Sequence, residues 1–485
     1  MPMTPMRNMF LVLRTQTIRP AVRRTATSLV FRLFGLLIGI VTNAVLARSL
    51  GVSEFGQFGV GLTILTIITQ LSDFGAVQAM TAEARRNPKL AGHVAGSGIC
   101  IRLITAFIGI AIAIPISLFT IPNTNAVVLI VIAVCAPLGA SGALIALSNA
   151  RLRPEIGSAL TLGQSALWMF AVLIVGFSDH PTAIDFAFAF AMTTALQTLI
   201  TLAFYGRKSM IGRPTWAVAR LLLSKSWPVG LLGLLVTSYY RVGGVLVIGL
   251  AGAHEAGLYT AAYKVIDVAQ IIPSLIVVPM LPVLIDALAQ GSMQLQRLSK
   301  AVIRLSVIVA IGSGLMIALF SDVIVRLIYG DAFGNSARVL EVLGLAFVGI
   351  TLGYVGSTLC FAIDRVKRQI PFVAVLGVLS LMLQPWAIGN WGGLGSAYVA
   401  AATEIAMSVL SLTLCAGPLG MSFRSIFGWR YPLFVLIIVC TYFLTKGSFV
   451  IGVIVCPIVF VIAMLFLKLV GKHEGNLILR RKSDS

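Results

Sequence analysis

The chain has 485 residues, of which 58% are hydrophobic and only 11% are charged, with a mean hydropathy of +1.00. This composition excludes a soluble globular protein and indicates a polytopic membrane protein. The net charge of +20 does not indicate a nucleic-acid-binding protein, because the basic residues gather in short loops between apolar segments.

Residues 1–25 precede the first apolar segment and contain several arginines but no acidic residue. We expect a basic cytoplasmic arm with an amphipathic stretch near Met9–Leu13. Two alternatives stay open, because the composition resembles a mitochondrial transit peptide and a signal peptide cleaved near Ala47 is conceivable.

Apolar stretches long enough to cross a bilayer follow one another from residue 26 onward. We count about 14 stretches of roughly 20 residues. Sorting the loops into alternating sides places about 27 of the 36 lysines and arginines on one side. That side is therefore predicted to be cytoplasmic, with both termini inside. The predicted spans are 26–48, 57–78, 97–119, 125–148, 159–178, 184–205, 227–250, 257–285, 301–321, 337–363, 370–388, 393–416, 429–445 and 448–468.

The loop between the first two spans recurs between the seventh and eighth. Residues 51–58 and 252–259 both have the pattern G-x-x-E-x-G-x-[FY]. Six spans separate the two turns, and an even number implies parallel repeats related by an axis along the membrane normal. We expect the glycines to provide positive φ or close backbone contact. Glu54 and Glu255 are expected to be structural, near helix amino termini.

This repeat divides the chain into predicted parts. They are a basic cytoplasmic arm (1–25), an N-lobe (26–205), a cytoplasmic amphipathic linker (206–226), a C-lobe (227–416), an extra helix pair (417–470) and a cytoplasmic tail (471–485).

Three segments carry a resemblance to a known family: Leu46–Phe58, Leu71–Gly75 and Ala256–Lys264. They resemble bacterial polysaccharide flippases of the O-antigen and exopolysaccharide type, in the multidrug/oligosaccharidyl-lipid/polysaccharide exporter superfamily. The resemblance implies an all-α polytopic fold with two six-helix lobes around a central cavity, plus two extra C-terminal helices. It also implies a flippase that moves an undecaprenyl-pyrophosphate-linked oligosaccharide across the bacterial inner membrane by alternating access, for cell-surface polysaccharide biosynthesis.

Other functions differ from this one in the residues they require. A cation-coupled multidrug exporter of the superfamily would favour acidic cavities, whereas the deep charges here are mostly basic; a lipid II flippase is a second alternative. An enzyme is not expected, because the largest outer loop, about 322–336, is short. No cofactor or metal is expected from scattered Cys and His. The expected partners are an anionic lipid-linked glycan, membrane lipids and a polysaccharide polymerase of the same pathway, but no nucleic acid.

Basic residues inside the spans are the predicted substrate site. At about 1.5 Å rise per residue, Arg241 and Lys264 lie about 13 and 10 Å from the outer ends of their helices. Such buried cations normally face a bundle interior or a wet cavity, and a guanidinium can bind phosphate bidentately. We expect Arg241, Lys264 and Arg32 to bind the pyrophosphate, and Tyr240 to contact a sugar. The alternatives are a structural ion pair for Arg241 or Lys264, snorkelling of Arg32 to the cytoplasmic interface, and interfacial anchoring or packing for Tyr240. Arg102 and Arg304 lie close to the inner ends of their helices and are expected to snorkel to that interface.

Three acidic residues are the predicted ion-coupling groups: Glu404, about 18 Å into its helix, Asp267 and Asp73. Asp267 could instead neutralise Lys264 one helical turn away. Members of the family often carry an acid in helix 7, where this chain has Gly243 and Gly244. Coupling through that acid is therefore in doubt.

Overall fold

The computed structural model describes residues 4–121, 125–151, 153–206, 211–290 and 292–420, and single positions between 433 and 462. Within these ranges the secondary structure is helical and contains no strand. The predicted extra helix pair (429–445 and 448–468) and the tail (471–485) lie almost wholly outside the described residues.

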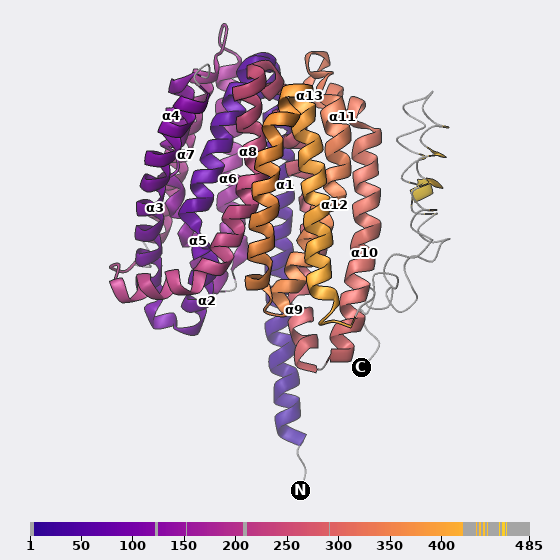
Figure 1. Cartoon of the computed structure of the whole chain (residues 1–485). Helices are drawn as coiled ribbons and strands as arrows, with labels where there is room; N and C mark the ends of the chain where they lie inside the picture. The colour runs from indigo at the N-terminus through magenta and orange to yellow at the C-terminus, as the bar shows by residue number, and fades with distance from the viewer. Residues whose placement is uncertain are drawn as a thin grey trace. The chain divides into compact units, whose positions relative to one another are not determined.

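The helices follow one another with short connections (Figure 1). They are α1 (Thr4–Asp73), α2 (Ala76–Arg86), η1 (Pro88–Leu90), α3 (Ala91–Thr120), α4 (Ala126–Ala133), η2 (Leu138–Gly142), α5 (Ala143–Ala150), α6 (Pro154–Gly176), α7 (Ala183–Gly206), α8 (Trp216–Ala269), α9 (Ile271–Gln290), α10 (Ser292–Leu319), α11 (Ser321–Tyr329), η3 (Asp331–Phe333), α12 (Ser336–Ala362) and α13 (Val366–Ala416).

Nine helical stretches in the described part of the chain are long and apolar enough to cross a membrane. Three of the longest, within α1, α8 and α13, contain a residue with non-helical φ and ψ angles. Each of these helices therefore holds one predicted span and all or part of the next. The all-helical, multi-pass prediction is confirmed.

The first glycine of each repeated turn interrupts its helix. Gly51 has φ 71° and ψ 176°, and Gly252 has φ 89° and ψ 174°. Both angles lie outside the region that residues with a Cβ adopt easily. The two turns thus share one backbone conformation, as the repeat predicted, and Gly392 (φ 58°) interrupts α13 between two further predicted spans.

The second glycine of each turn provides a close backbone contact. A Cβ at Gly56 would lie 2.3 Å from the carbonyl oxygen of Ala253, and a Cβ at Gly257 would lie 2.0 Å from that of Val52. The two turns therefore pack on each other at positions where only glycine fits.

The predicted fourth span is not continuous. α4 ends at Ala133 and α5 begins at Ala143, and turns and the η2 helix connect them. Pro137 lacks an N–H group, and Gly139 and Gly142 are poor helix formers, so this segment leaves the α-helical path. Local 3₁₀ geometry of this kind satisfies backbone groups that an interruption of an α-helix would leave free within a membrane.

Contacts divide the chain into two compact units, Met1–Gly257 (unit 1) and Leu258–Ser485 (unit 2). Unit 1 extends beyond the predicted lobe boundary because the first part of α8 packs on earlier helices. A Cβ at Gly230 would lie 2.3 Å from the carbonyl oxygen of Phe74, and one at Gly249 would lie 3.0 Å from Ile121. The lobe assignment stays a prediction.

The predicted linker (206–226) is partly described. Residues 207–210 lie outside the described ranges, and from Trp216 the chain is already part of α8. Trp216 is 77% exposed while Leu222 is buried, and Lys225 forms an ion pair with Glu83 of α2 at 2.6 Å. The described part of the linker therefore consists of a non-helical stretch, residues 211–215, and the first turns of α8, which the ion pair joins to α2.

Unit 1 has a core made mainly of small and branched residues from α2, α3 and α5. Tyr205 of α7 and Leu222 of α8 also belong to this core. Figure 1 shows α3, α4 and α7 side by side in this unit, where α4 contacts both neighbours. Unit 2 packs α9, α10, α12 and α13 around a separate apolar core. Its α8 segment ends at Ala269, and α9 begins at Ile271, two residues before Pro273.

Candidate functional site

Arg32 lies on α1 within a candidate membrane span, and its side chain is exposed. Its Nε donates a hydrogen bond to Ser158 Oγ of α6, at 3.4 Å. Ser158 Oγ is in turn 2.7 Å from Ser28 Oγ, and both serines are buried. The buried hydroxyl pair therefore anchors one edge of the guanidinium.

Arg32 differs from Arg24 and Arg102 in its charge balance. Arg24 lies 3.7 Å from Glu155, and Arg102 lies 3.1 Å from Asp73. Among the described residues, no carboxylate forms an ion pair with Arg32. A guanidinium has five N–H donors, so most of the hydrogen-bonding capacity of Arg32 is available to an anion.

A cavity of about 470 Å³ lies beside this guanidinium, between α1, α5 and α6. This volume is within the range of sites that bind small molecules, roughly 300–1,000 Å³. We call it the Arg32 cavity. Its lining residues are Phe31, Arg32, Gly35, Leu36, Ile145, Asn149, Pro154, Gly157, Ser158, Thr161, Leu162 and Ser165.

Asp73 ends α1 at a strained turn. Phe74 has φ 37° and Gly75 has φ 73°, and the turn packs on the backbone of Gly230. Arg102 is only 8% exposed and its Nη1 lies 3.1 Å from Asp73 Oδ1, without the alignment of a hydrogen bond. The snorkelling predicted for Arg102 is therefore wrong, because a carboxylate from a neighbouring helix neutralises it inside the protein.

Arg241 and Tyr240 are half-buried neighbours on α8, in unit 1. The Arg241 Cζ atom lies 5.0 Å from the centre of the Tyr240 ring, which is cation–π distance. Arg241 takes part in interactions within the protein. The tyrosine thus stabilises the cation that was predicted to bind substrate, and direct sugar or phosphate contact by either residue stays a prediction.

Lys264 and Asp267 lie further along α8, in unit 2, and both are half-buried and engaged in contacts. Burial raises the pKa of Tyr329 on α11, and the carboxylate of Asp267 raises it further. Asp267 therefore lies close to a buried phenol. That Lys264 shares one cavity with Arg241 stays a prediction.

Glu404 lies on α13 in unit 2 and is 7% exposed. A Cβ at Gly349 of α12 would lie 2.6 Å from the Glu404 carbonyl carbon, so the backbones of α12 and α13 touch at this point. Glu404 has partners within the protein. The structure therefore buries Glu404 inside the protein, and ion coupling by Glu404 stays a prediction.

Glu54 stabilises a helix other than its own. Its Oε2 accepts a hydrogen bond from the backbone N–H of Ala183 at 3.0 Å, at the amino terminus of α7. A carboxylate there satisfies a free N–H group and is favoured by the helix dipole. The structural role predicted for Glu54 is thus confirmed, with α7 as the helix concerned.

The comparisons with known proteins agree with this geometry. A family model described as "Polysaccharide biosynthesis protein" matches residues 21–288, more than half of the chain. No curated protein matches the chain by sequence.

Solved structures share the fold at low sequence identity. The lipid II flippase MurJ in an inward closed conformation has a TM-score of 0.71 and 13% identity, over 91% of this chain and 98% of that one. A MATE transporter bound to MaL6 has a TM-score of 0.58 and 14% identity, over 82% and 96%. A MOP superfamily transporter from Pyrococcus furiosus, described by the reverse polarity of its binding pocket, has a TM-score of 0.57 and 13% identity, over 82% and 95%. The chain therefore has the fold of MOP superfamily transporters.

Proposed function

Because the chain belongs to the polysaccharide biosynthesis protein family, we propose that it flips an undecaprenyl-pyrophosphate-linked oligosaccharide across the bacterial inner membrane. Transport proceeds by alternating access between the two leaflets, with both termini in the cytoplasm, and serves the assembly of a cell-surface polysaccharide. A polymerase of the same pathway then uses the product.

The Arg32 cavity is the observation that carries this proposal. A cation in a membrane span is costly unless it is paired or hydrated, and among the described residues Arg32 has one hydroxyl partner, Ser158, but no carboxylate. A pyrophosphate would supply the missing negative charge and accept hydrogen bonds from the free edge of the guanidinium. Asn149 and Ser165 on the cavity wall offer further polar contacts.

Multidrug export of cations fits this cavity less well. A cationic drug would meet Arg32 as a like charge, which opposes binding in a region of low dielectric constant. Lipid II export is the second candidate, because the MurJ fold covers nearly the whole chain and the substrate named for that protein is also lipid-linked. Rescue of cells depleted of their lipid II flippase would favour the second candidate over the first.

The test compares Arg32→Ala and Arg32→Lys with Arg86→Ala. Arg86 is an exposed arginine in the last turn of α2, so its variant removes the same charge away from the cavity. Binding of undecaprenyl pyrophosphate to the purified protein in nanodiscs is measured by native mass spectrometry. Surface glycan is measured in a strain that lacks its own flippase.

We expect Arg32→Ala to weaken binding about 10- to 100-fold, since a hydrogen bond to a charged group contributes about 1.5–3 kcal/mol, and to abolish surface glycan at normal membrane abundance. Arg32→Lys keeps the charge without the planar fork and should retain part of both. Arg86→Ala should behave as wild type. Wild-type binding by Arg32→Ala would contradict the role of Arg32, and Arg241→Ala and Lys264→Ala would then test the other predicted phosphate ligands.

A further inference from the structure

The first turns of α8 have an exposed face that plays no part in the proposed function. Trp216, Arg220, Leu223 and Trp227 follow one another at helical spacing, so they lie along one side of the helix. Trp216 is 77% exposed, Trp227 is 44% exposed and Leu223 is 38% exposed, and Arg220 is exposed as well. We call these four residues the α8 face.

The opposite side of these turns is fixed to the rest of unit 1. Leu222 is buried, and Lys225 Nζ lies 2.6 Å from Glu83 Oε2 of α2. The carbonyl oxygen of Ser226 would lie 2.8 Å from a Cβ at Gly75, which is a close backbone contact. Figure 1 shows this part of α8 running across the lower end of unit 1, beside α2. Rotation of the helix would break the ion pair and the backbone contact, so the α8 face stays directed outward.

The non-helical stretch before α8 is held on the start of α3. The N–H group of Gly212 donates a hydrogen bond to the carbonyl oxygen of Gly92 at 2.9 Å. The N–H group of Thr215 donates to Ser97 Oγ at 3.0 Å. Arg213 lies between these two contacts in the chain, and its side chain is exposed. The backbone of this stretch is thus bonded within the protein, while its cation is available to a ligand from outside.

Three exposed cations lie at this end of unit 1. Lys89 precedes α3, Arg213 belongs to the stretch held on α3, and Arg220 lies on the α8 face. None of the three forms an ion pair with a residue that the structure describes. The carboxylate that contacts these turns, Glu83, is only 4% exposed and is already paired with Lys225. The positive charge of the three exposed cations is therefore not neutralised by the described residues.

The composition of the α8 face fits the level of lipid headgroups. Tryptophan is enriched at membrane–water interfaces, where its ring contacts apolar groups and its N–H group contacts polar ones. The α8 face ends at Trp227, where the predicted span of residues 227–250 begins. The guanidinium of Arg220, between the two tryptophans, has the planar fork that binds phosphate oxygens. An acidic protein would also attract the cations, but it would not account for tryptophans at both ends of a face beside a predicted span.

We propose that the α8 face, together with Lys89 and Arg213, binds the anionic headgroups of phospholipids in the cytoplasmic leaflet. Arg220 binds the phosphodiester, and Leu223 contacts the apolar groups just below it. Clusters of basic residues at the cytoplasmic ends of membrane spans attract anionic lipids in this way. The bound lipid holds the ends of α2, α3 and α8 at the membrane surface. This binding involves neither the Arg32 cavity nor the oligosaccharide, so it does not depend on the proposed function.

The test uses the purified full-length protein and phosphatidylglycerol as the anionic probe. Native mass spectrometry measures the dissociation constant of the first bound lipid, with phosphatidylcholine of the same acyl chains as the zwitterionic comparison. The variants are Arg220→Gln and the double variant Lys89→Gln/Arg213→Gln. Arg153→Gln is the matched control, because Arg153 is an exposed arginine at the amino-terminal cap of α6, outside the α8 face. Arg32→Ala is measured beside them, because a phosphate could also enter the Arg32 cavity.

We expect wild type to bind phosphatidylglycerol at least about tenfold more tightly than phosphatidylcholine. Arg220→Gln should weaken phosphatidylglycerol binding about fivefold and the double variant about 25-fold, since each basic residue near an anionic lipid surface contributes roughly a factor of five.

Arg153→Gln and Arg32→Ala should keep the wild-type preference between the two lipids. Equal affinity of wild type for both lipids would overturn the proposal even if a variant fails to fold. Equal effects of Arg220→Gln and Arg153→Gln would also overturn it, and so would a loss of the preference in Arg32→Ala alone, which would place the lipid in the Arg32 cavity.

Discussion

Gly257→Ala is the sharpest test of the contact between the two repeated turns. The added Cβ would lie 2.0 Å from the carbonyl oxygen and 2.8 Å from the carbonyl carbon of Val52, whereas ordinary contacts begin at 3.4 Å. Both partners are backbone, so the turns must separate by more than an ångström. Overpacking of this kind costs about 1–3 kcal/mol, which exceeds the gain of up to about 1 kcal/mol from replacing a helical glycine with alanine.

Gly39→Ala is the matched control for this substitution. It makes the same change within a helix of unit 1, where the new Cβ meets nothing within 4 Å. Thermal unfolding of the purified protein should show a lower melting temperature for Gly257→Ala and an unchanged or higher one for Gly39→Ala. Equal melting temperatures for the two variants would refute the inferred glycine contact.

Further predictions follow from the polar and strained groups of unit 1. Gly51→Ala should cost about 1–2 kcal/mol, since φ of 71° is unfavourable for a residue with a Cβ; a wild-type denaturation midpoint would contradict this. Glu54→Ala should destabilise by about 0.5–2 kcal/mol, as loss of a helix cap does, and should speed hydrogen exchange at the Ala183 amide. Asp73→Asn should cost about 3–5 kcal/mol by leaving Arg102 buried without its charge partner. The double variant Asp73→Asn/Arg102→Gln should recover part of that loss, and strictly additive losses in a double-mutant cycle would argue against the pair.

Features that depend on local chain chemistry were predictable from the sequence. The glycine turns at Gly51 and Gly252 were expected from their residue types, and the structure gives both a positive φ. The break in the fourth span was missed, although Pro137, Gly139 and Gly142 lie within it. The proline and the two glycines are visible in the sequence, but mean hydropathy is calculated over a window and does not reveal a change in backbone geometry.

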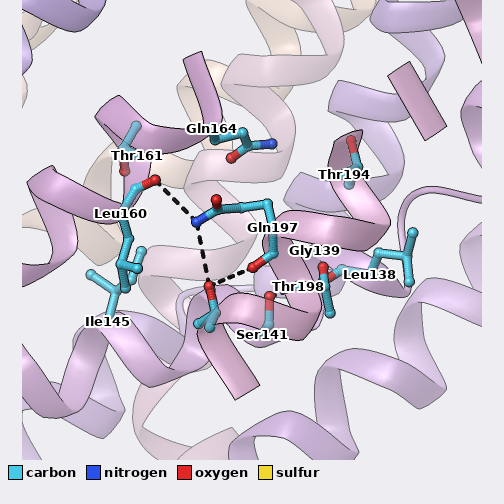
Figure 2. Close-up of a pocket in the computed structure, with 12 residues that line it drawn as sticks. Leu138, Gly139, Ser141, Ile145, Leu160, Thr161, Gln164, Thr194, Gln197 and Thr198 are labelled. Carbon is cyan, nitrogen blue, oxygen red and sulfur yellow. Dashed lines mark hydrogen bonds between the residues drawn. The ribbon is translucent and has the colours of Figure 1, made fainter. Parts of the chain in front are cut away.

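Features that depend on which side chains meet in space were not predictable. Arg102 was expected to reach the interface, and instead it pairs with Asp73, which lies earlier in the chain and on another helix. Arg32 was identified by its depth alone, while the serine pair that anchors it comes from α1 and α6. The cavity of about 110 Å³ in unit 1 (Figure 2) is lined by three separate stretches of chain, residues 138–145, 160–164 and 194–201, whose polar residues look like ordinary helix-face residues when each helix is considered alone.

The contact between the two turns is reciprocal, and this bears on how such a chain arises. Gly56 meets Ala253 while Gly257 meets Val52, so each partner position in one repeat is matched by its counterpart in the other. Reciprocity of this kind defines an isologous interface, the contact that two identical subunits form across a twofold axis. A half-length ancestor would have formed it with a second copy of itself, and gene duplication with fusion would have preserved it. Each turn would then have been selected to fit its own duplicate, which explains why one glycine pattern satisfies both sides.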